Sequence, residues 1–242
     1  MANDEKLVDS INGVELCKII KRLNRFVVLV EHNNHIYRAL LRNTGKLYGI
    51  IEPGKHAVCT WKKQGKTHFN LIGVIDVDDS IAIVDTNLQE KIFMKSIEKG
   101  YLHEFKKCKV VKRNPRIGNS RLDFLLECRG KPVYIELKSA VMRGEDGVTA
   151  QYPDTPSDRG VRHMLLLLDL RRKGYRPYLI FISGLPNVKR FAPNYKVDPR
   201  LRDIVPKLRD NGVGVLSYRL HGEIVNNDLY LYITSRSISV VV

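Results

Sequence analysis

Apolar and polar residues alternate in two neighbouring runs near the middle of the chain, at 121–127 and 133–138. Every second position is apolar, with Leu122, Phe124 and Leu126 in the first run and Val133, Ile135 and Leu137 in the second. A period of two residues predicts strands with one buried face. Arg129-Gly130 lies between the runs and supplies a tight turn. The pattern therefore predicts a β-hairpin.

This hairpin would bring charged side chains together on its polar face. Its register places Asp123 directly opposite Glu136, and Arg121 opposite Lys138. Carboxylates opposed across a sheet repel each other, and a hard cation such as Mg²⁺, which prefers carboxylate oxygens, would remove that repulsion. Lys138 could then contact an anion held by the cation. The alternative is two solvent-exposed acids beside a surface lysine, because the D…ExK spacing is loose.

Short apolar runs separated by turn residues also predict strands before residue 87. They are FVVLVE, IYRALL, HAVCTWKK, THFNLIGVIDV and SIAIVDT, and Asn33-Asn34 between the first two is a good turn signal. Residues 7–24 instead have a helical or mixed pattern. The strands favour a small β-barrel of the oligonucleotide-binding (OB) type. Trp61 could stack a base on it, although we favour a position in the core or at its edge.

From Leu88 onward, helical patterns alternate with strand patterns. The first helix is predicted to end near Gly100. A second would begin with Thr155 as N-cap, Pro156 at the first helical position and Asp158 two residues later. The remaining runs predict a strand, a helix, a strand and a final hairpin or tail: RPYLIFI, DPRLRDIVPKLRDNG, VGVLSYR and residues 223–242. This order predicts a mixed α/β fold, with a sheet flanked by helices.

The composition is that of a globular protein with ample core. The chain has 242 residues, of which 43% are hydrophobic and 28% charged, and no apolar run approaches the ~20 residues that span a bilayer. The acidic start MANDEKLVDS is unlike a signal peptide. The cysteines lack CxxC spacing, which favours reduced thiols in a cytoplasmic protein; they are Cys17, Cys59, Cys108 and Cys128.

Positive charge is concentrated in the C-terminal part of the chain. Residues 86–242 hold 29 basic and 16 acidic side chains, a net of +13, whereas residues 1–85 hold 12 and 10, a net of +2. Such a surface attracts a phosphate backbone irrespective of its sequence. DNA is therefore the expected partner. A compositional bias or a membrane-surface protein would also explain the charge.

The residues expected to contact phosphates lie in a basic segment and near the start of the second helix. Between 106 and 121 there are seven Lys or Arg and no acid, and the candidates are Lys106, Lys107, Lys112, Arg113, Arg116 and Arg121. On the helix, Arg159, Arg162 and His163 are three and four residues apart, a patch that suits a phosphate. The alternatives are a solvated loop and, for His163, a half-buried ring satisfied by its neighbours.

From about Leu23 to Tyr218 the chain resembles the sugar fermentation stimulation protein family, SfsA. Its SRIDFLL…YIEVKS signature is matched at 120–126 and 134–139, and its FPDAxTERGxxHLxEL signature by YPDTPSDRGVRHMLLLL. LNRFVVLVE, Asn43-Thr44-Gly45 and Val84-Asp85-Thr86 resemble its N-terminal landmarks. Asp85 stands where the family usually has Asn, and Asp158 where it usually has Glu.

The resemblance implies an OB-like β-barrel over residues 1–86, a PD-(D/E)xK nuclease-like domain over 87–242, and DNA binding. In that nuclease superfamily the motif's Asp and Glu hold Mg²⁺, and its Lys orients or activates the attacking water. By position, these roles fall to Asp123, Glu136 and Lys138. Many members add a Glu from the preceding helix, but the nearby candidates have no defensible spacing here: Glu90, Glu98 and Glu104.

The residues and the resemblance together predict a phosphodiesterase that acts on DNA with Mg²⁺ or Mn²⁺. Asp123, Glu136 and a backbone carbonyl near Leu137 would coordinate the ion. One alternative is a non-catalytic DNA-binding regulator of sugar metabolism genes. Another is an enzyme that uses this scaffold on RNA or a small molecule. An exposed barrel edge would also allow a homodimer.

Overall fold

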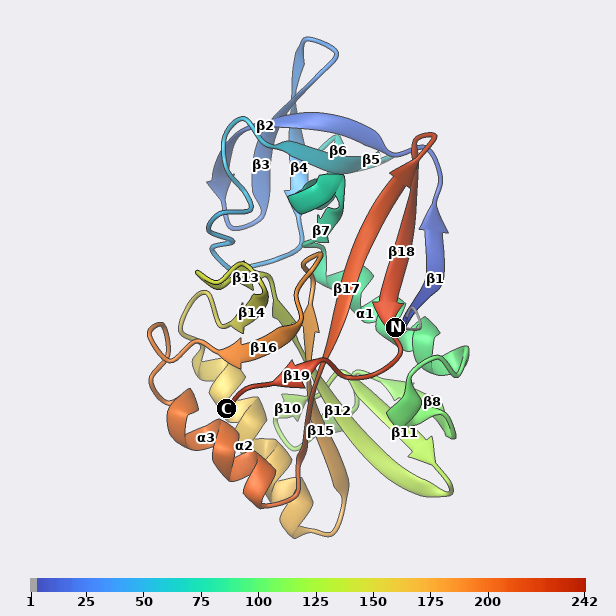
Figure 1. The fold of residues 1–242 in the computed structure, drawn as a ribbon, viewed down its shortest axis with the longest axis vertical. Coiled ribbons are helices and arrows are strands. Elements are labelled where there is room, and N and C mark those ends of the chain that lie inside the picture. The colour runs from blue at the N-terminus through green and yellow to red at the C-terminus, as the bar shows by residue number, and fades with distance from the viewer. Residues whose placement is uncertain (1–3) are drawn as a thin grey trace.

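The computed structural model describes residues 4–242, which form a closed barrel joined to a helix-flanked sheet. Figure 1 shows the barrel at one end of the long axis and helices α2 and α3 at the other. One continuous sheet links the two ends, because β7 (Ile81–Ile83) pairs with both β6 of the barrel and β17 of the C-terminal half. The fold is mixed α/β, as the sequence predicted.

The N-terminal domain is a closed OB barrel. Its strands are β2 (Glu15–Asn24), β3 (Val27–His32), β4 (His35–Leu41), β5 (His56–Trp61) and β6 (Phe69–Ile75). Antiparallel neighbours follow one another around the barrel, and the parallel pairing of β4 with β6 closes it. The predicted turn at Asn33 and Asn34 is confirmed, since both residues have the positive φ angles of a tight hairpin.

Residues 7–24 are strands, so a helical interpretation of that segment is wrong. β1 (Glu5–Ile11) pairs with β18 (Asp228–Thr234), a strand near the C-terminus, and β2 belongs to the barrel. Trp61 is 51% exposed, and its ring packs 4.1 Å from the ring of the buried Phe69. It therefore lies at the edge of the barrel core.

The C-terminal sheet carries helices on both faces. Its strands, in spatial order, are β8 (Cys108–Arg113), β11 (Phe124–Cys128), β12 (Lys131–Ala140), β15 (Arg176–Ser183) and β17 (Gly214–Val225). Pairing is antiparallel from β8 to β12 and parallel from β12 to β17. Alternate residues of β15 enter opposite cores: Ile180 and Ile182 pack with α1 (Thr86–Glu98), whereas Leu179 and Phe181 share a core with α2 (Asp158–Arg172) and α3 (Leu201–Asp210).

Smaller elements complete the chain. A separate two-stranded hairpin consists of β9 (Arg116–Ile117) and β10 (Ser120–Arg121), and a small sheet of β13 (Met142–Arg143), β14 (Thr149–Tyr152), β16 (Arg190–Pro193) and β19 (Ser239–Val240). Single 3₁₀ turns lie at Val77–Asp79 and His103–Phe105. Within residues 4–242, no helix combines the length and apolar character needed to cross a bilayer.

Two local predictions are wrong. Helix α2 begins at Asp158 with Ser157 as its N-cap, whose hydroxyl accepts a hydrogen bond from Gly160 N at 2.9 Å, so Thr155 lies outside the helix. Cys108 and Cys128 form a disulfide between paired strands, whereas the sequence favoured reduced thiols. Cys108 and Cys128 are 20 positions apart, and only the pairing of β8 with β11 makes them neighbours.

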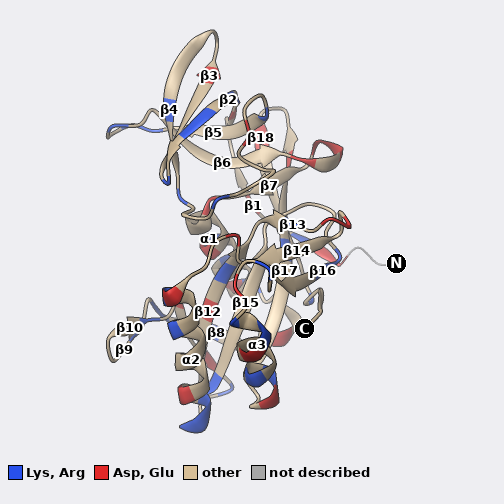
Figure 2. Cartoon of the chain, turned by 90° about the vertical axis from the view of Figure 1, so that its left-hand side faces the viewer, with Lys and Arg blue, Asp and Glu red and all other residues tan. Residues whose placement is uncertain are grey.

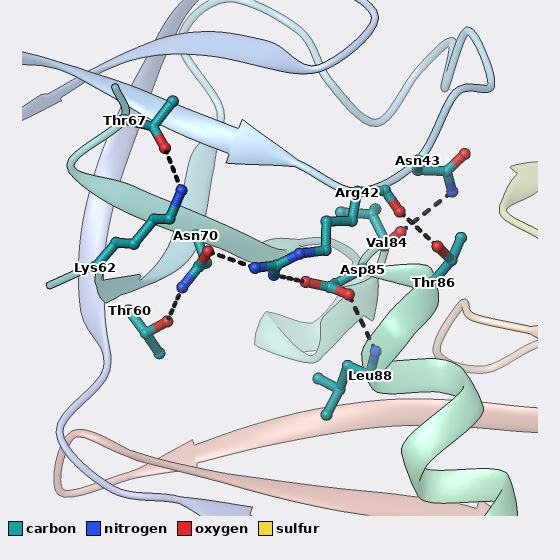
Figure 3. A network of polar contacts seen from close by, with 10 residues as sticks. All are labelled: Arg42, Asn43, Thr60, Lys62, Thr67, Asn70, Val84, Asp85, Thr86 and Leu88. Carbon is teal, nitrogen blue, oxygen red and sulfur yellow. Dashed lines mark hydrogen bonds and ion pairs between the residues drawn. The ribbon is translucent and has the colours of Figure 1, made fainter. Parts of the chain in front are cut away.

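A polar network ties the barrel to the first residues of α1 (Figure 3). Arg42, just after β4, donates to Asp85 Oδ2 and to Asn70 Oδ1, both at 2.9 Å. Asp85 is the N-cap of α1 and accepts from Leu88 N at 3.0 Å. Hydrogen bonds from a charged residue to both a cap and a neighbouring strand fix the orientation of the helix. The network therefore positions α1 relative to the barrel.

Candidate metal and phosphate site

The β11–β12 hairpin has the register that the sequence predicted. Phe124 pairs with Ile135, and Asp123 N donates to Ile135 O at 3.1 Å, which places Asp123 beside Glu136. The turn residues Arg129 and Gly130 both have positive φ angles. Arg121 departs from the prediction, because it lies in β10, opposite Arg116, rather than opposite Lys138. The chain leaves the regular ladder before Asp123, so the hairpin is shorter than expected.

Glu136 is buried and has one engaged and one free carboxylate oxygen. The residue is 3% exposed, and its Oε1 accepts from Lys138 Nζ and lies 2.7 Å from His163 Nδ1. Burial raises the pKa of Glu136, but the hydrogen bonds from His163 and Lys138 outweigh burial and hold the pKa below its usual value. Within residues 4–242, Glu136 Oε2 has no hydrogen-bond partner. A buried carboxylate oxygen without a partner is costly unless something else binds it.

The pKa of Asp123 is shifted in the opposite direction to that of Glu136. Burial and repulsion from Glu136 raise the pKa of Asp123 to about 7, although Leu137 N donates to its Oδ2 at 2.6 Å. Lys138 offsets part of this increase, and Glu90 adds to it. Burial is the larger cause of the raised pKa of Asp123, and repulsion from Glu136 is the second. A bound cation would remove this repulsion.

Glu90 of α1 is the acidic residue that the sequence spacing did not identify. It lines a cavity of about 160 Å³ together with Asp123 and Leu137, and its Oε1 accepts from Arg113 Nη2 at 2.7 Å. Glu90 precedes Asp123 by a helix, a strand and a hairpin, so spacing alone could not place the two side chains together. The apolar spacing after Leu88 did predict the helix, and Glu90 was one of the three nearby acids considered, with Glu98 and Glu104.

The donor set fits a hard divalent cation. The carboxylates of Asp123 and Glu136, with that of Glu90 in the cavity that Asp123 lines, are the kind of oxygen ligand that Mg²⁺ and Ca²⁺ prefer. The unpartnered Oε2 of Glu136 is the specific atom that such an ion would satisfy. The described residues do not contain three His, Cys, Asp or Glu side chains already converged on one point.

The residues predicted to contact phosphates differ in solvent exposure: all except His163 are exposed. Those that are exposed are Lys106, Lys107, Lys112, Arg113, Arg116, Arg121, Arg159 and Arg162, and Figure 2 shows blue positions on the β9–β10 hairpin and along α2. Arg113 already pairs with Glu90. His163 is 5% exposed and bonded to Glu136, which agrees with the alternative of a ring satisfied by its neighbours.

Arg116 and Arg121 bring two positive charges together in the β9–β10 hairpin. They lie directly opposite each other in the register and both are exposed. Like charges opposed across two strands are unfavourable. An anion between the two guanidinium groups would remove the repulsion, as the divalent cation would for the two carboxylates. The hairpin immediately precedes Asp123, so such an anion would lie beside the acidic pair.

Comparisons with known proteins agree with this architecture. The family description "SfsA N-terminal OB domain" matches residues 20–84, and "Sugar fermentation stimulation protein RE domain" matches residues 87–224. A sugar fermentation stimulation protein homolog from Pyrococcus furiosus is 44% identical over 214 residues, covering 88% of this chain and 92% of the relative. A homolog from Archaeoglobus fulgidus is 35% identical over 205 residues, covering 85% and 88%.

A solved structure has the same fold throughout. The structure of Pyrococcus furiosus SfsA in complex with Ca²⁺ superposes with a TM-score of 0.90 at 39% sequence identity. The match covers 98% of this chain and 100% of that one. Both the barrel and the helix-flanked sheet are therefore shared with that protein.

Proposed function

Because the chain belongs to the sugar fermentation stimulation protein family, with an OB barrel and a nuclease-like C-terminal domain, we propose that it binds DNA and hydrolyses phosphodiester bonds with Mg²⁺ or Mn²⁺. The observation that carries the proposal is the cluster of Asp123, Glu136 and Lys138, in which the buried Glu136 Oε2 has no hydrogen-bond partner among residues 4–242. A purely structural ion pair between Glu136 and Lys138 would not need the second carboxylate of Asp123, which Glu136 repels.

Asp123, Glu136 and the carbonyl of Leu137 are the proposed metal ligands, and Glu90 is the proposed additional acid. A bound divalent cation supplies neutralisation of phosphate charge and a lower pKa for a bound water. The Ca²⁺ in the related Pyrococcus furiosus structure supports the choice of a hard cation, because Ca²⁺ and Mg²⁺ both take oxygen ligands. Mn²⁺ suits the same carboxylate and carbonyl donors.

Lys138 is the proposed catalytic cation. Its side chain is 11% exposed and its Nζ is held by Glu136, so its position at the floor of the site is defined before substrate binds. From there the ammonium group can donate to an oxygen that gains negative charge or orient the attacking water. His163 contacts the same carboxylate oxygen. We assign His163 the role of positioning Glu136.

The exposed basic residues are the proposed DNA contacts. Arg116 and Arg121 lie just before Asp123, and Arg159 and Arg162 lie in the first turns of α2, whose residue His163 reaches Glu136. Phosphate contacts of this kind hold a nucleic acid in position without reading its bases. Binding should therefore weaken steeply with salt, since each neutralised phosphate releases counterions.

Cleavage assays on labelled DNA with Mg²⁺, Mn²⁺ or EDTA test the proposal. Asp123→Asn and Lys138→Ala should both abolish cleavage, and Asp123→Asn should leave DNA binding largely intact. Asp169→Asn, at an exposed position of α2, serves as the matched control and should cleave like the wild type. Failure of pure wild-type protein to cut single- or double-stranded DNA with either metal would refute the hydrolytic part.

A non-catalytic DNA-binding regulator is the second candidate. It is favoured by the ion pairs within the cluster, where Lys138 and His163 both contact Glu136 Oε1 and already offset much of its charge. Under this alternative, DNA affinity would depend on salt but not on divalent metal. Titration of DNA binding with and without Mn²⁺ at constant ionic strength separates the two functions.

A further inference from the structure

A cavity of about 630 Å³ lies between the barrel and the C-terminal domain, next to the acidic cluster. Leu137, Lys138 and Ser139 form its floor. Leu137 and Ser139 also line the smaller cavity that holds Asp123 and Glu90. One wall comes from the barrel and includes Phe26, and the other from the segment 152–157.

The two walls are joined at the back of the cavity, which fixes its width. Leu47 N of a barrel loop donates to Asp154 Oδ2 at 2.8 Å. Gly45 lies against the same carboxylate, so a Cβ atom at this position would have to displace the Asp154 side chain. Arg22 holds the loop by donating to Gly45 O at 2.7 Å and Lys46 O at 2.8 Å.

Phe26 is an exposed aromatic residue on a well-held turn at the rim of this cavity. It is 49% exposed, yet Asn24 Oδ1 accepts from its N at 2.8 Å and its O accepts from Leu41 N at 2.8 Å. Arg22 also donates to Arg25 O at 3.0 Å. The guanidinium group of Arg25 lies 5.9 Å from the centre of the Phe26 ring. A half-exposed aromatic ring beside a cation offers a face on which a base can stack and a charge for its phosphate.

The opposite wall contains a free hydroxyl. Thr155 Oγ1 is buried and, within the described part of the chain, has no hydrogen-bond partner. Thr155 and Phe26 line the same cavity from opposite domains. Buried hydroxyl groups usually have a partner. A ligand in the cavity could provide one for Thr155.

We propose that this cavity binds a single, unpaired nucleic-acid strand, with a base stacked on Phe26 and the adjoining phosphates between Arg25 and Lys138. The proposal rests on the function proposed above, because it uses the Lys138 end of the cavity as the reacting end. The volume lies in the range of about 300–1,000 Å³ typical of small-ligand pockets, which suits one or two nucleotides and is too small for a stretch of duplex. Lys138 and Glu136 are both recessed, which favours a flexible single strand over a rigid duplex as the occupant.

Trp61 is another exposed aromatic ring of the barrel domain, as is Tyr48. Trp61 is half exposed, but it belongs to an aromatic cluster with Phe69 and Tyr37 and donates to Glu15 Oε1 at 3.2 Å. The described residues that line the large cavity do not include Trp61. Substitution at Trp61 is therefore a matched control: an exposed aromatic residue of the same barrel, away from the proposed strand.

Binding in EDTA, measured by fluorescence anisotropy at constant salt, tests the proposal without cleavage. The probes are a labelled single strand and the blunt duplex of the same sequence. Phe26→Ala should weaken single-strand binding about 5- to 100-fold, the equivalent of one lost stacking contact, and should leave duplex binding unchanged. Phe26→Tyr should retain affinity, whereas Phe26→Leu, which lacks an aromatic face, should not. Trp61→Ala should bind like the wild type.

Three results would overturn the proposal. They are an unchanged single-strand affinity in Phe26→Ala, an equal loss of duplex affinity in Phe26→Ala, and a larger loss of single-strand affinity in Trp61→Ala than in Phe26→Ala. Circular dichroism of each variant checks that it folds, and the Phe26→Tyr protein provides a folded comparison at the same position. The outcome is independent of hydrolysis. If Phe26→Ala weakens single-strand binding but the wild type never cleaves DNA, the strand site is supported and the hydrolytic function is refuted. If the wild type cleaves DNA but Phe26→Ala binds the single strand normally, the hydrolytic function is supported and the strand site is refuted.

Discussion

Replacing Asp123 by Asn should stabilise the metal-free protein, and most strongly at alkaline pH. The folded pKa of Asp123 is raised to about 7 by burial and by Glu136, against about 3.9 for an unperturbed Asp. A raised carboxyl pKa means that folding favours the protonated form. The contribution of Asp123 is therefore fully present below about pH 4 and is lost as the pH rises through 7.

The size of the effect follows from the difference in pKa. Each pKa unit corresponds to 1.36 kcal/mol, so ionised Asp123 costs at most about 4 kcal/mol at pH 8 and about 1.5 kcal/mol at pH 5. Asn is neutral at both pH values, and its side-chain oxygen can still accept from Leu137 N. The advantage of Asp123→Asn over the wild type should therefore grow by nearly 3 kcal/mol between pH 5 and pH 8.

Urea denaturation in EDTA at a series of pH values measures this difference. Asp146→Asn is the control of opposite sign, because hydrogen bonds from Thr149 and Arg190 hold the pKa of Asp146 well below its usual value. That substitution should destabilise the protein at neutral pH. Stability curves for Asp123→Asn and wild type that run parallel across the pH range would refute the paired-carboxylate reasoning. Saturating Mn²⁺ should stabilise the wild type selectively, since a cation favours the ionised pair.

The remaining predictions concern the rest of the site and its supports. Reduction of the Cys108–Cys128 disulfide, which spans 20 positions, should lower the free energy of unfolding by roughly 3 kcal/mol; a double Cys→Ser variant should then show no response to reductant in urea titrations. Asp85→Ala, which removes the cap of α1 and the partner of Arg42, should cost about 3 kcal/mol by the same assay, whereas Asp85→Asn keeps a capping side chain and should lose less. Glu90→Gln should weaken Mn²⁺ binding in calorimetry, and equal affinity would remove Glu90 from the ligand set.

The sequence was most informative where local pattern and turn chemistry agree. Alternating residues around Arg129-Gly130 predicted the register that places Asp123 beside Glu136, because a tight turn leaves a two-strand ladder little freedom. Similar patterns predicted the barrel strands, although residues 7–24 were misread. Their strands pair with distant partners, and isolated amphipathic patterns of that length do not distinguish a strand from a helix.

Contacts across long separations could not be predicted in the same way. The Cys108–Cys128 bond depends on which strand lies beside β11. The choice of Ser157 over Thr155 as N-cap depends on where the preceding loop meets the barrel. In each case residues near each other in sequence are compatible with several arrangements, and packing selects one.

The sequence by itself determined most of the strands and helices and the register that sets Asp123 beside Glu136, because periodicity and turns act over a few residues. Only the tertiary structure decided that Glu90 lines the same cavity as Asp123 and that His163 contacts Glu136. It also decided that Phe26 of the barrel lines the same cavity as Lys138. These relations depend on how the barrel and the sheet pack together, and that packing is the sum of many weak contacts between residues far apart in the chain.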